Sequence, residues 1–174
     1  AVAAGDLHSV VCTGDAVLSF GWGGWGQLGY GAGIQAAPRV VRELLAEDVV
    51  AAAASSCSTV VCTAEGRAYW FGRLGDKNGQ ILFAQPTPVL LGGLERVVGV
   101  AAGAGYLLAW TGSGELCTRG GGCHGQLGHG VRENEAAPRL VEGLAGQQVV
   151  GADGGSRHSV VCTASGRVYT FGTE

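Results

Sequence analysis

The closest approach to a metal site in this chain is the group formed by Cys117, Cys123 and His124. Thiolate and imidazole are ligands that zinc prefers, and structural zinc sites usually collect four of them from closely spaced pairs. The Cys-x5-Cys-His spacing lacks this pairing, and no second cluster in the sequence completes four ligands. We therefore predict that the chain binds no metal.

Two histidines could serve as catalytic bases, and both lie at the start of a repeated six-residue segment. His8 and His158 occupy the same position in this segment, and Ser58 and Tyr106 replace them in the other copies. A position that accepts His, Ser or Tyr indicates a structural hydrogen bond rather than general-base chemistry. The sequence also contains no nucleophile elbow, phosphate-binding loop or paired acidic motif. We predict no catalytic residues and no enzymatic activity.

One segment matches the consensus of a dinucleotide-binding motif but lacks the strand-to-helix setting that the motif requires. The segment Gly21-Trp22-Gly23-Gly24-Trp25-Gly26 contains Gly-x-Gly-x-x-Gly. That motif binds a pyrophosphate where a strand turns into a helix, and no helix is expected after it here. Its glycines recur along the chain as turn residues, so we predict no cofactor.

The cysteines follow a repeat rather than a disulfide pattern. Cys12, Cys62 and Cys162 occupy one repeat position. Equivalent strands of stacked sheets lie about 10 Å apart, which is too far for a disulfide bond. We expect these thiols to be small core side chains, a usage that favours an intracellular protein.

An internal repeat of about 50 residues must position all these side chains. The segment His8-Ser9-Val10-Val11-Cys12-Thr13 recurs as Ser58 to Thr63, weakens to Tyr106-Leu107-Leu108-Ala109-Trp110-Thr111 and returns intact as His158 to Thr163. The closing threonines are Thr13, Thr63, Thr111 and Thr163, spaced by 50, 48 and 52 residues. Other marks keep this period: Gly26-Gln27-Leu28-Gly29 with Gly125-Gln126-Leu127-Gly128, and Pro38, Pro88 and Pro138. The repeat is therefore the unit of the fold.

Each unit reads as four short strands joined by glycine turns. In the second unit we expect strands at Val49 to Ala54, Thr59 to Thr63, Arg67 to Phe71 and Pro88 to Leu91, the last at the outer edge because proline lacks a donor. A weak helical pattern covers Arg42 to Asp48. Gln27 and Gln126 are expected to hydrogen-bond to nearby backbone and hold the glycine-rich loops. The sequence predicts an all-β protein built as a β-propeller.

The combined motif resembles the RCC1 repeat over essentially the whole chain. It reads Gly-x-x-His-Ser/Thr, then Thr-x-x-Gly-x-Val-Tyr-x-Phe/Trp-Gly, then Gly-Gln-Leu-Gly, then Pro-x-x-Val, with the best copies at Gly155 to Gly172 and Phe20 to Val41. The second and third copies depart from it, for example with Arg119 in place of the aromatic residue. The resemblance implies a seven-bladed propeller.

The chain then supplies three full four-stranded repeats plus part of a fourth, with blade boundaries at about 1–48, 49–96, 97–148 and 149–174. Such a partial propeller leaves an apolar face uncovered at each end, which is not expected of a soluble monomer. We therefore expect the remaining blades to come from the same protein or from a partner chain. The chain starts at Ala1 and contains no methionine, which is typical of a processed or excised segment.

Binding residues are expected where the units differ, because variable loops on a constant scaffold usually carry specificity. The residues in question are Trp22, Trp25, Tyr30, Arg73, Asp76, Lys77, His124 and His129. Aromatic residues and arginine are favoured interface anchors. An equally supported alternative is that Trp22 and Trp25 simply pack against the neighbouring blade.

Family members include an exchange factor for the GTPase Ran, an ultraviolet receptor, ciliary proteins and ubiquitin-ligase modules. The resemblance thus implies a non-catalytic interaction or scaffold module, with a small GTPase or a cytoskeletal or ciliary assembly as partner, in the cytoplasm, nucleus or cilium. Alternatives are nucleotide exchange on a Ran-like GTPase, chromatin binding and a tryptophan-based light sensor. The net charge of -3 disfavours nucleic-acid binding, and no apolar run is long enough to cross a membrane.

Overall fold

The protein folds into four antiparallel β-sheets that follow one another along the chain, as seen in a computed structural model that describes residues 1–75 and 80–173. The first sheet contains β1 (Val2–Ala4), β2 (His8–Cys12), β3 (Val17–Trp22) and β4 (Ile34–Val40). The second contains β5 (Val49–Ala54), β6 (Ser58–Thr63), β7 (Ala68–Gly75) and β8 (Ile81–Leu90). The third contains β9 (Val97–Gly103), β10 (Tyr106–Thr111), β11 (Leu116–Gly120) and β12 (Glu135–Leu140). The fourth contains β13 (Val149–Gly154), β14 (His158–Thr163) and β15 (Val168–Gly172).

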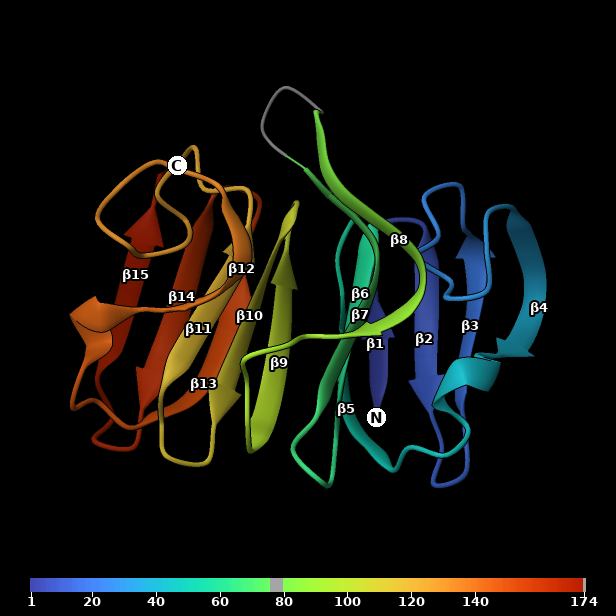
Figure 1. Cartoon of the computed structure of the whole chain (residues 1–174), viewed down its shortest axis with the longest axis horizontal. Coiled ribbons are helices and arrows are strands. Elements are labelled where there is room, and N and C mark those ends of the chain that lie inside the picture. Colours follow the sequence, from blue (N-terminus) through green and yellow to red (C-terminus); the bar gives the residue numbers. More distant parts are fainter. Residues whose placement is uncertain (76–79, 174) are drawn as a thin grey trace.

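These sheets are propeller blades, and we number them 1 to 4 in chain order (Figure 1). Within each blade, strands that are neighbours in sequence pair antiparallel. The first strands of successive blades pack together, β1 with β5, β5 with β9, and β9 with β13, which places them nearest the axis. The predicted all-β partial propeller, three full blades and part of a fourth, is therefore confirmed.

The expected strands of blade 2 appear with small differences. β5 has the predicted bounds, whereas β8 begins earlier than the Pro88 that marked it, at Ile81. This strand is the outer edge of its sheet, where a missing backbone donor costs least. The weak helical pattern at Arg42 to Asp48 becomes one 3-10 turn, η1 (Arg42–Leu44), and η2 (Glu142–Leu144) repeats it in blade 3.

A glycine at the fifth position of each third strand forms a bulge in the first three blades. Gly21, Gly72 and Gly120 have φ angles of 111°, 102° and 115°, and the pairing register with the fourth strand shifts beside each of them. A Cβ at Gly72 would stand 2.3 Å from the carbonyl oxygen of Cys57. Only glycine fits this bulge, because both the φ angle and the close approach exclude a side chain.

The core lies between blades, in three apolar clusters rather than in one centre. Between blades 1 and 2, Val10 and Val17 meet Val61 and Phe71, and all four are at most 1% exposed. A second cluster joins blades 2 and 3. A third cluster lies between blades 3 and 4 and contains Leu108 and Leu116 of blade 3. Each blade therefore buries apolar side chains against its neighbour.

Side-chain hydrogen bonds also join blade 1 to blade 2 and blade 3 to blade 4. His8 Nε2 lies 2.8 Å from Thr59 Oγ1, and Thr59 donates its one hydroxyl proton to the carbonyl oxygen of Gln27 at 2.9 Å. Nε2 of His8 must therefore carry a proton and donate it to Thr59. This confirms the predicted structural role for His8, whereas His158, at the same repeat position, is exposed.

Tyr106 makes the equivalent contact between blades 3 and 4. Its hydroxyl donates to the carbonyl oxygen of His158 at 2.5 Å and lies 3.0 Å from Ser159 Oγ. Burial raises the pKa of Tyr106 to about 12, so the hydroxyl stays a donor at neutral pH.

We expect Tyr106→Phe to lower the free energy of unfolding by about 1 kcal/mol, because the partly buried carbonyl of His158 loses the Tyr106 hydroxyl as a donor and keeps only the Gly155 N–H at 2.8 Å, while the ring remains. Urea denaturation of both proteins measures this difference. Tyr169→Phe is the control, because Tyr169 is only partly buried and should change the free energy by much less. Equal effects of the two substitutions would contradict the contact's role.

Candidate protein-binding surface

The variable loops of the repeats lie on one face of the propeller (Figure 1). The connections from β3 to β4 and from β11 to β12 both emerge at the upper edge of the blades in this view, and so do the turns between the first and second strands. A rigid stack of sheets thus presents several loops side by side. Surfaces of this kind carry binding residues without disturbing the scaffold.

An aromatic cluster stands on this face where blades 1 and 2 meet. The rings of Trp22 and Trp25 are 6.0 Å apart and inclined by 77°, an edge-to-face arrangement. The guanidinium of Arg73, from blade 2, lies 4.4 Å from the centre of the Trp25 ring. We call these three residues the tryptophan cluster. It unites three residues that the sequence placed in two different repeats.

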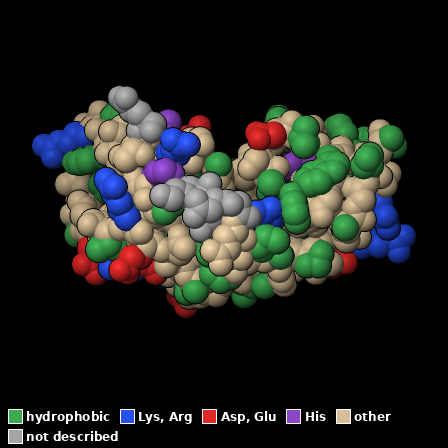
Figure 2. Space-filling model, turned by 90° about the horizontal axis from the view of Figure 1, so that it is seen from above, with side chains coloured by type: hydrophobic (Ala, Val, Ile, Leu, Met, Phe, Trp, Pro, Cys, Tyr) green, Lys and Arg blue, Asp and Glu red, His purple; other side chains and the backbone are tan. Residues whose placement is uncertain are grey.

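Two exposed aliphatic residues adjoin the tryptophan cluster. Leu7 is 60% exposed, Ile34 is 78% exposed and Trp25 itself is 38% exposed. Both aliphatic residues adjoin Trp22 through the backbone, because the Trp22 N–H donates to the Leu7 carbonyl and Ile34 pairs with Trp22 across strands. Figure 2 shows hydrophobic side chains gathered on the blade 1 side of this face.

The Gly-Gln-Leu-Gly loop holds the tryptophan cluster in place. The fully buried side chain of Gln27 accepts a hydrogen bond from the backbone N–H of Trp25 at 3.0 Å. Gln126 holds the N–H of His124 in the same way at 2.9 Å. The predicted role of the two glutamines is confirmed, and the Trp25 ring is presented from a fixed backbone.

Tyr30 and His129 take part in the packing of their own blades. The Tyr30 hydroxyl donates to the carbonyl oxygen of Ser19 at 3.0 Å, and Arg39 covers its ring at 4.5 Å. His129 Nε2 lies 2.9 Å from Thr118 Oγ1, and burial lowers the pKa of this histidine. Both residues therefore have a structural contact at the position where we expected a binding residue.

The remaining predicted residues fall outside the tryptophan cluster. His124, in the loop of blade 3, has its Nδ1 3.4 Å from Thr173 Oγ1 of blade 4, which parallels the contact of Trp25 with Arg73. Asp76 and Lys77 lie outside the described residues. A binding role for any of these loop residues stays a prediction.

The sequence analysis did not select three residues that form or support this face, namely Leu7, Ile34 and Arg119. Leu7 and Ile34 stand next to the loops that we singled out, and an isolated exposed aliphatic residue carries no signal in a sequence. Arg119 was noted as a departure from the motif, and it packs between the rings of Trp70 at 4.7 Å and Phe83 at 4.9 Å. The departure of Arg119 from the repeat pattern was the available hint.

The thiols match the expected core role in two of the three copies. Cys12 and Cys62 are buried, and burial raises the pKa of Cys62 to about 11, which keeps the thiol protonated. Cys162 is exposed because no blade covers it, and all six cysteines are free. Within residues 1–75 and 80–173, no three His, Cys, Asp or Glu side chains come together as metal ligands, and no helix is long and apolar enough to cross a membrane.

Stacked four-stranded blades with loops gathered on one face define a repeat β-propeller segment, and comparison with known proteins identifies its family. The model of the regulator of chromosome condensation (RCC1) repeat matches residues 113–162. The human E3 ubiquitin-protein ligase HERC2 is 36% identical over 98% of this chain. Yeast RCC1 (Prp20) bound to Kap60 superposes over 100% of the chain with a TM-score of 0.86 at 23% identity. The chain belongs to the RCC1-repeat family.

The chain spans a small part of these relatives. It covers 4% of HERC2 and 43% of the yeast RCC1 chain. A second yeast structure, of Prp20p, described with its binding properties to Gsp1p and histones, matches 100% of the chain and 44% of its own, with a TM-score of 0.81 at 19% identity. The ligase activity in the name of HERC2 therefore belongs to a protein of which this chain resembles only a small segment.

Proposed function

We propose that this chain is a non-catalytic protein-interaction module whose binding surface is the tryptophan cluster with Leu7 and Ile34. The observation that carries the proposal is an exposed aromatic ring, that of Trp25, whose backbone N–H is held by a buried glutamine and whose ring is stacked by an arginine from the next blade. Tryptophan and arginine surrounded by apolar side chains are the usual hot spots of protein interfaces. A fixed ring also loses little conformational entropy when a partner binds.

The relatives support a protein partner as the class of ligand. Yeast RCC1 was solved bound to Kap60, and Prp20p is described with Gsp1p and histones. In this chain the formal charge is -3, and the surface that we single out combines Arg73 with two tryptophans and two exposed aliphatic residues. Both features favour a protein over a nucleic acid. An intracellular setting is part of the same proposal.

We expect Trp25→Ala to weaken partner binding by about 30-fold or more, the loss typical of an interface hot spot. The partner is first captured from native extract with the purified chain, identified by mass spectrometry and then purified for titration. Arg39→Glu is the matched control, because Arg39 also stacks on an aromatic ring, that of Tyr30, but outside the tryptophan cluster.

The proposal fails if Trp25→Ala binds the purified partner as tightly as the unaltered chain does. It also fails if Arg39→Glu and Trp25→Ala weaken binding equally. Thermal denaturation of both variants must give a Tm close to that of the unaltered chain, since Trp25 is partly exposed and should contribute little to folding.

Nucleotide exchange on a Ran-like small GTPase is the narrower alternative, and chromatin association is another. The units of 48 to 52 residues leave no room for an inserted wedge, which disfavours exchange. Release of a fluorescent guanine nucleotide from such a GTPase, with and without the chain, tests the first alternative, and a salt-dependent gel shift with nucleosomes tests the second.

A further inference from the structure

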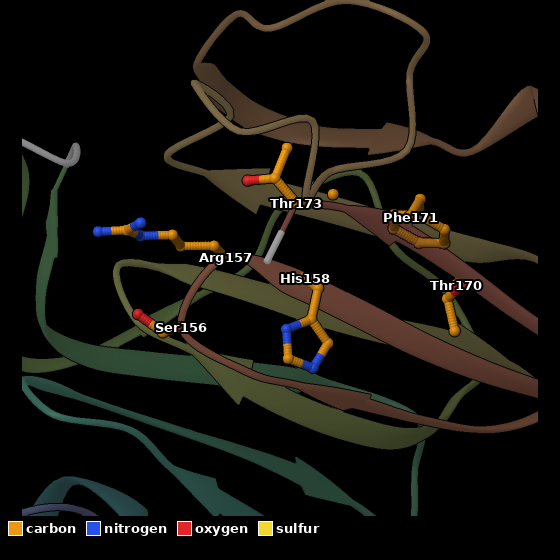
Figure 3. Close-up of a pocket in the computed structure, with 7 residues that line it drawn as sticks. Ser156, Arg157, His158, Thr170, Phe171 and Thr173 are labelled. Atoms are coloured by element: carbon orange, nitrogen blue, oxygen red, sulfur yellow. The ribbon is translucent and has the colours of Figure 1, made fainter.

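The hairpin formed by β7 and β8 of blade 2 rises above the loops of the neighbouring blades. These strands have 8 and 10 residues, whereas the equivalent strands of blades 1 and 3 have at most 7. Figure 1 shows the upper end of β8 reaching beyond the upper ends of the other strands, and Figure 3 shows the loops of the last two blades at the same edge. Because blade 2 lies between blades 1 and 3, the hairpin stands between their loops.

The hairpin lacks the buried glutamine that holds the loops of blades 1 and 3. Gln27 is 0% exposed and Gln126 is 3% exposed, and each accepts a hydrogen bond from a backbone N–H of its own loop. Gln80 stands at the equivalent repeat position in blade 2 and is exposed. Other contacts must therefore fix the hairpin.

Arg119 of blade 3 contacts the hairpin from one side. Its guanidinium carbon lies 4.7 Å from the centre of the Trp70 ring and 4.9 Å from that of the Phe83 ring. Trp70 is on β7 and Phe83 is on β8, so one arginine stacks on both strands of the hairpin. Trp70 is 3% exposed and belongs to the apolar cluster between blades 2 and 3. A cation over two aromatic faces in such a partly desolvated place is attracted by both rings.

This arginine stands where the repeat motif has an aromatic residue. Phe71 of blade 2 occupies the position, and its ring packs against Gly29, the last glycine of the Gly-Gln-Leu-Gly loop in blade 1. Phe171 packs against Gly128 of blade 3 in the same way. Blade 2 has no such glycine, because the chain continues from Ile81 into β8. The arginine and the raised hairpin therefore occur together, at the interface where the contact between an aromatic ring and a glycine is missing.

Ring stacking rather than an ion pair holds Arg119. Within residues 1–75 and 80–173 its guanidinium forms no salt bridge, and its buried Nε has no hydrogen-bond partner. Burial lowers the pKa of Arg119 from its ordinary value, since water is partly excluded from the charge. An apolar residue would serve folding at least as well as an uncompensated cation in this place. This arginine therefore points to a role beyond stability.

The hairpin connects this contact with the tryptophan cluster. Phe83 is followed on β8 by Ala84, which pairs with Arg73 on β7. The backbone N–H of Arg73 donates to the carbonyl oxygen of Cys57 at 2.7 Å, and its guanidinium lies 4.4 Å from the centre of the Trp25 ring. Because the backbone of Arg73 is fixed at the base of the hairpin, a tilt of the hairpin changes mainly the direction of its side chain. The hairpin thus has an arginine–aromatic stack on each side, one towards blade 1 and one towards blade 3.

We propose that Arg119 is a positioning residue of the binding surface, which holds the hairpin through Trp70 and Phe83 at the angle that lays Arg73 over Trp25. The inference rests on the proposed function of the tryptophan cluster. It makes partner binding depend on a residue of blade 3 that lies outside the tryptophan cluster.

The first test needs no partner. In a proton–nitrogen correlation NMR spectrum, the ring current of Trp25 should displace the Nε–H signal of Arg73 upfield, and Arg73→Lys identifies this signal by removing it. Arg119→Ala should abolish most of the displacement. Phe83→Leu, which keeps Arg119 but removes one of its two rings, should do the same.

Arg39→Ala is the matched control, because it removes an arginine that stacks on Tyr30 at 4.5 Å, outside the hairpin. It should leave the Arg73 signal in place. An unchanged signal in Arg119→Ala or in Phe83→Leu overturns the proposal, and so does an equal displacement in Arg39→Ala. Hydrogen exchange at the amides of β10 should stay unchanged in Arg119→Ala. Faster exchange there would mean that Arg119 stabilises blade 3 as a whole, which also contradicts the proposal.

The second test uses the purified partner that the unaltered chain captures. Arg119→Ala should weaken its binding by about threefold to tenfold. The same substitution should add no further loss in a chain that already carries Arg73→Ala, because Arg119 acts through Arg73. Equal losses with and without Arg73 would contradict a positioning role. If Trp25→Ala leaves partner binding unchanged, the proposed function fails, whereas the NMR result still decides whether Arg119 positions Arg73.

Discussion

Replacing Phe71 with alanine should lower the free energy of unfolding by about 3–5 kcal/mol, the range for truncating a buried phenylalanine. Phe71 is 0% exposed, although it stands on the third strand of blade 2 and faces blade 1. Its ring packs against Gly29, where a Cβ would come within 3.0 Å of the ring. Alanine would leave a cavity at the interface of the two blades, which a stack of rigid sheets cannot close.

Phe171→Ala is the matched control for this prediction. Phe171 makes the same contact with Gly128 of blade 3, but it is only partly buried. Urea denaturation should therefore give a clearly smaller loss for Phe171→Ala. Equal losses would mean that burial between blades does not govern stability here.

Acidification should destabilise the protein through His8, by up to roughly 3 kcal/mol between about pH 6.5 and pH 4. Burial lowers the pKa of His8 to about 4, and the nearby charge of Asp6 opposes this only in part. The physical cause is visible in the hydrogen bonds. Nε2 already donates to Thr59, so a second proton must go to Nδ1, which has no hydrogen-bond partner among the described residues.

The sign of this dependence follows from proton binding. In the unfolded chain His8 takes up a proton near pH 6.5, and in the folded chain only near pH 4. Between these values the unfolded state binds more protons, so the free energy of unfolding falls as the pH falls. The contribution is complete above about pH 6.5 and lost below about pH 4.

His8→Gln should remove this part of the pH dependence, since glutamine can still donate to Thr59 but does not titrate. Urea denaturation at several pH values between 4 and 7 measures it, as the difference between the variant and the unaltered chain. His158→Gln serves as the control, because that side chain is exposed and should leave the pH profile unchanged. A profile for His8→Gln that parallels the unaltered chain would contradict a buried, neutral His8.

The tryptophan cluster shows how far the sequence could lead towards a site. Trp22, Trp25 and Arg73 were singled out because they vary between repeats. Sequence could not show that Arg73 stacks on Trp25, because the two residues belong to different blades and meet only through blade packing. The same criterion also selected Tyr30 and His129, whose side chains form hydrogen bonds within their own blades. Variation between repeats marks both binding loops and adjustments of packing.

The sequence by itself determined the repeat, the four-strand order of each blade and the glycines at the bulges, because these depend on local patterns of side chains and on φ angles. The tertiary structure alone decided burial. His8–Thr13 and His158–Thr163 are the same six residues and both form the second strand of a blade, yet His8 is 3% exposed and His158 lies open to solvent. A strand's conformation is set by its own residues, whereas its burial is set by the neighbouring blade, which covers the first copy and not the second.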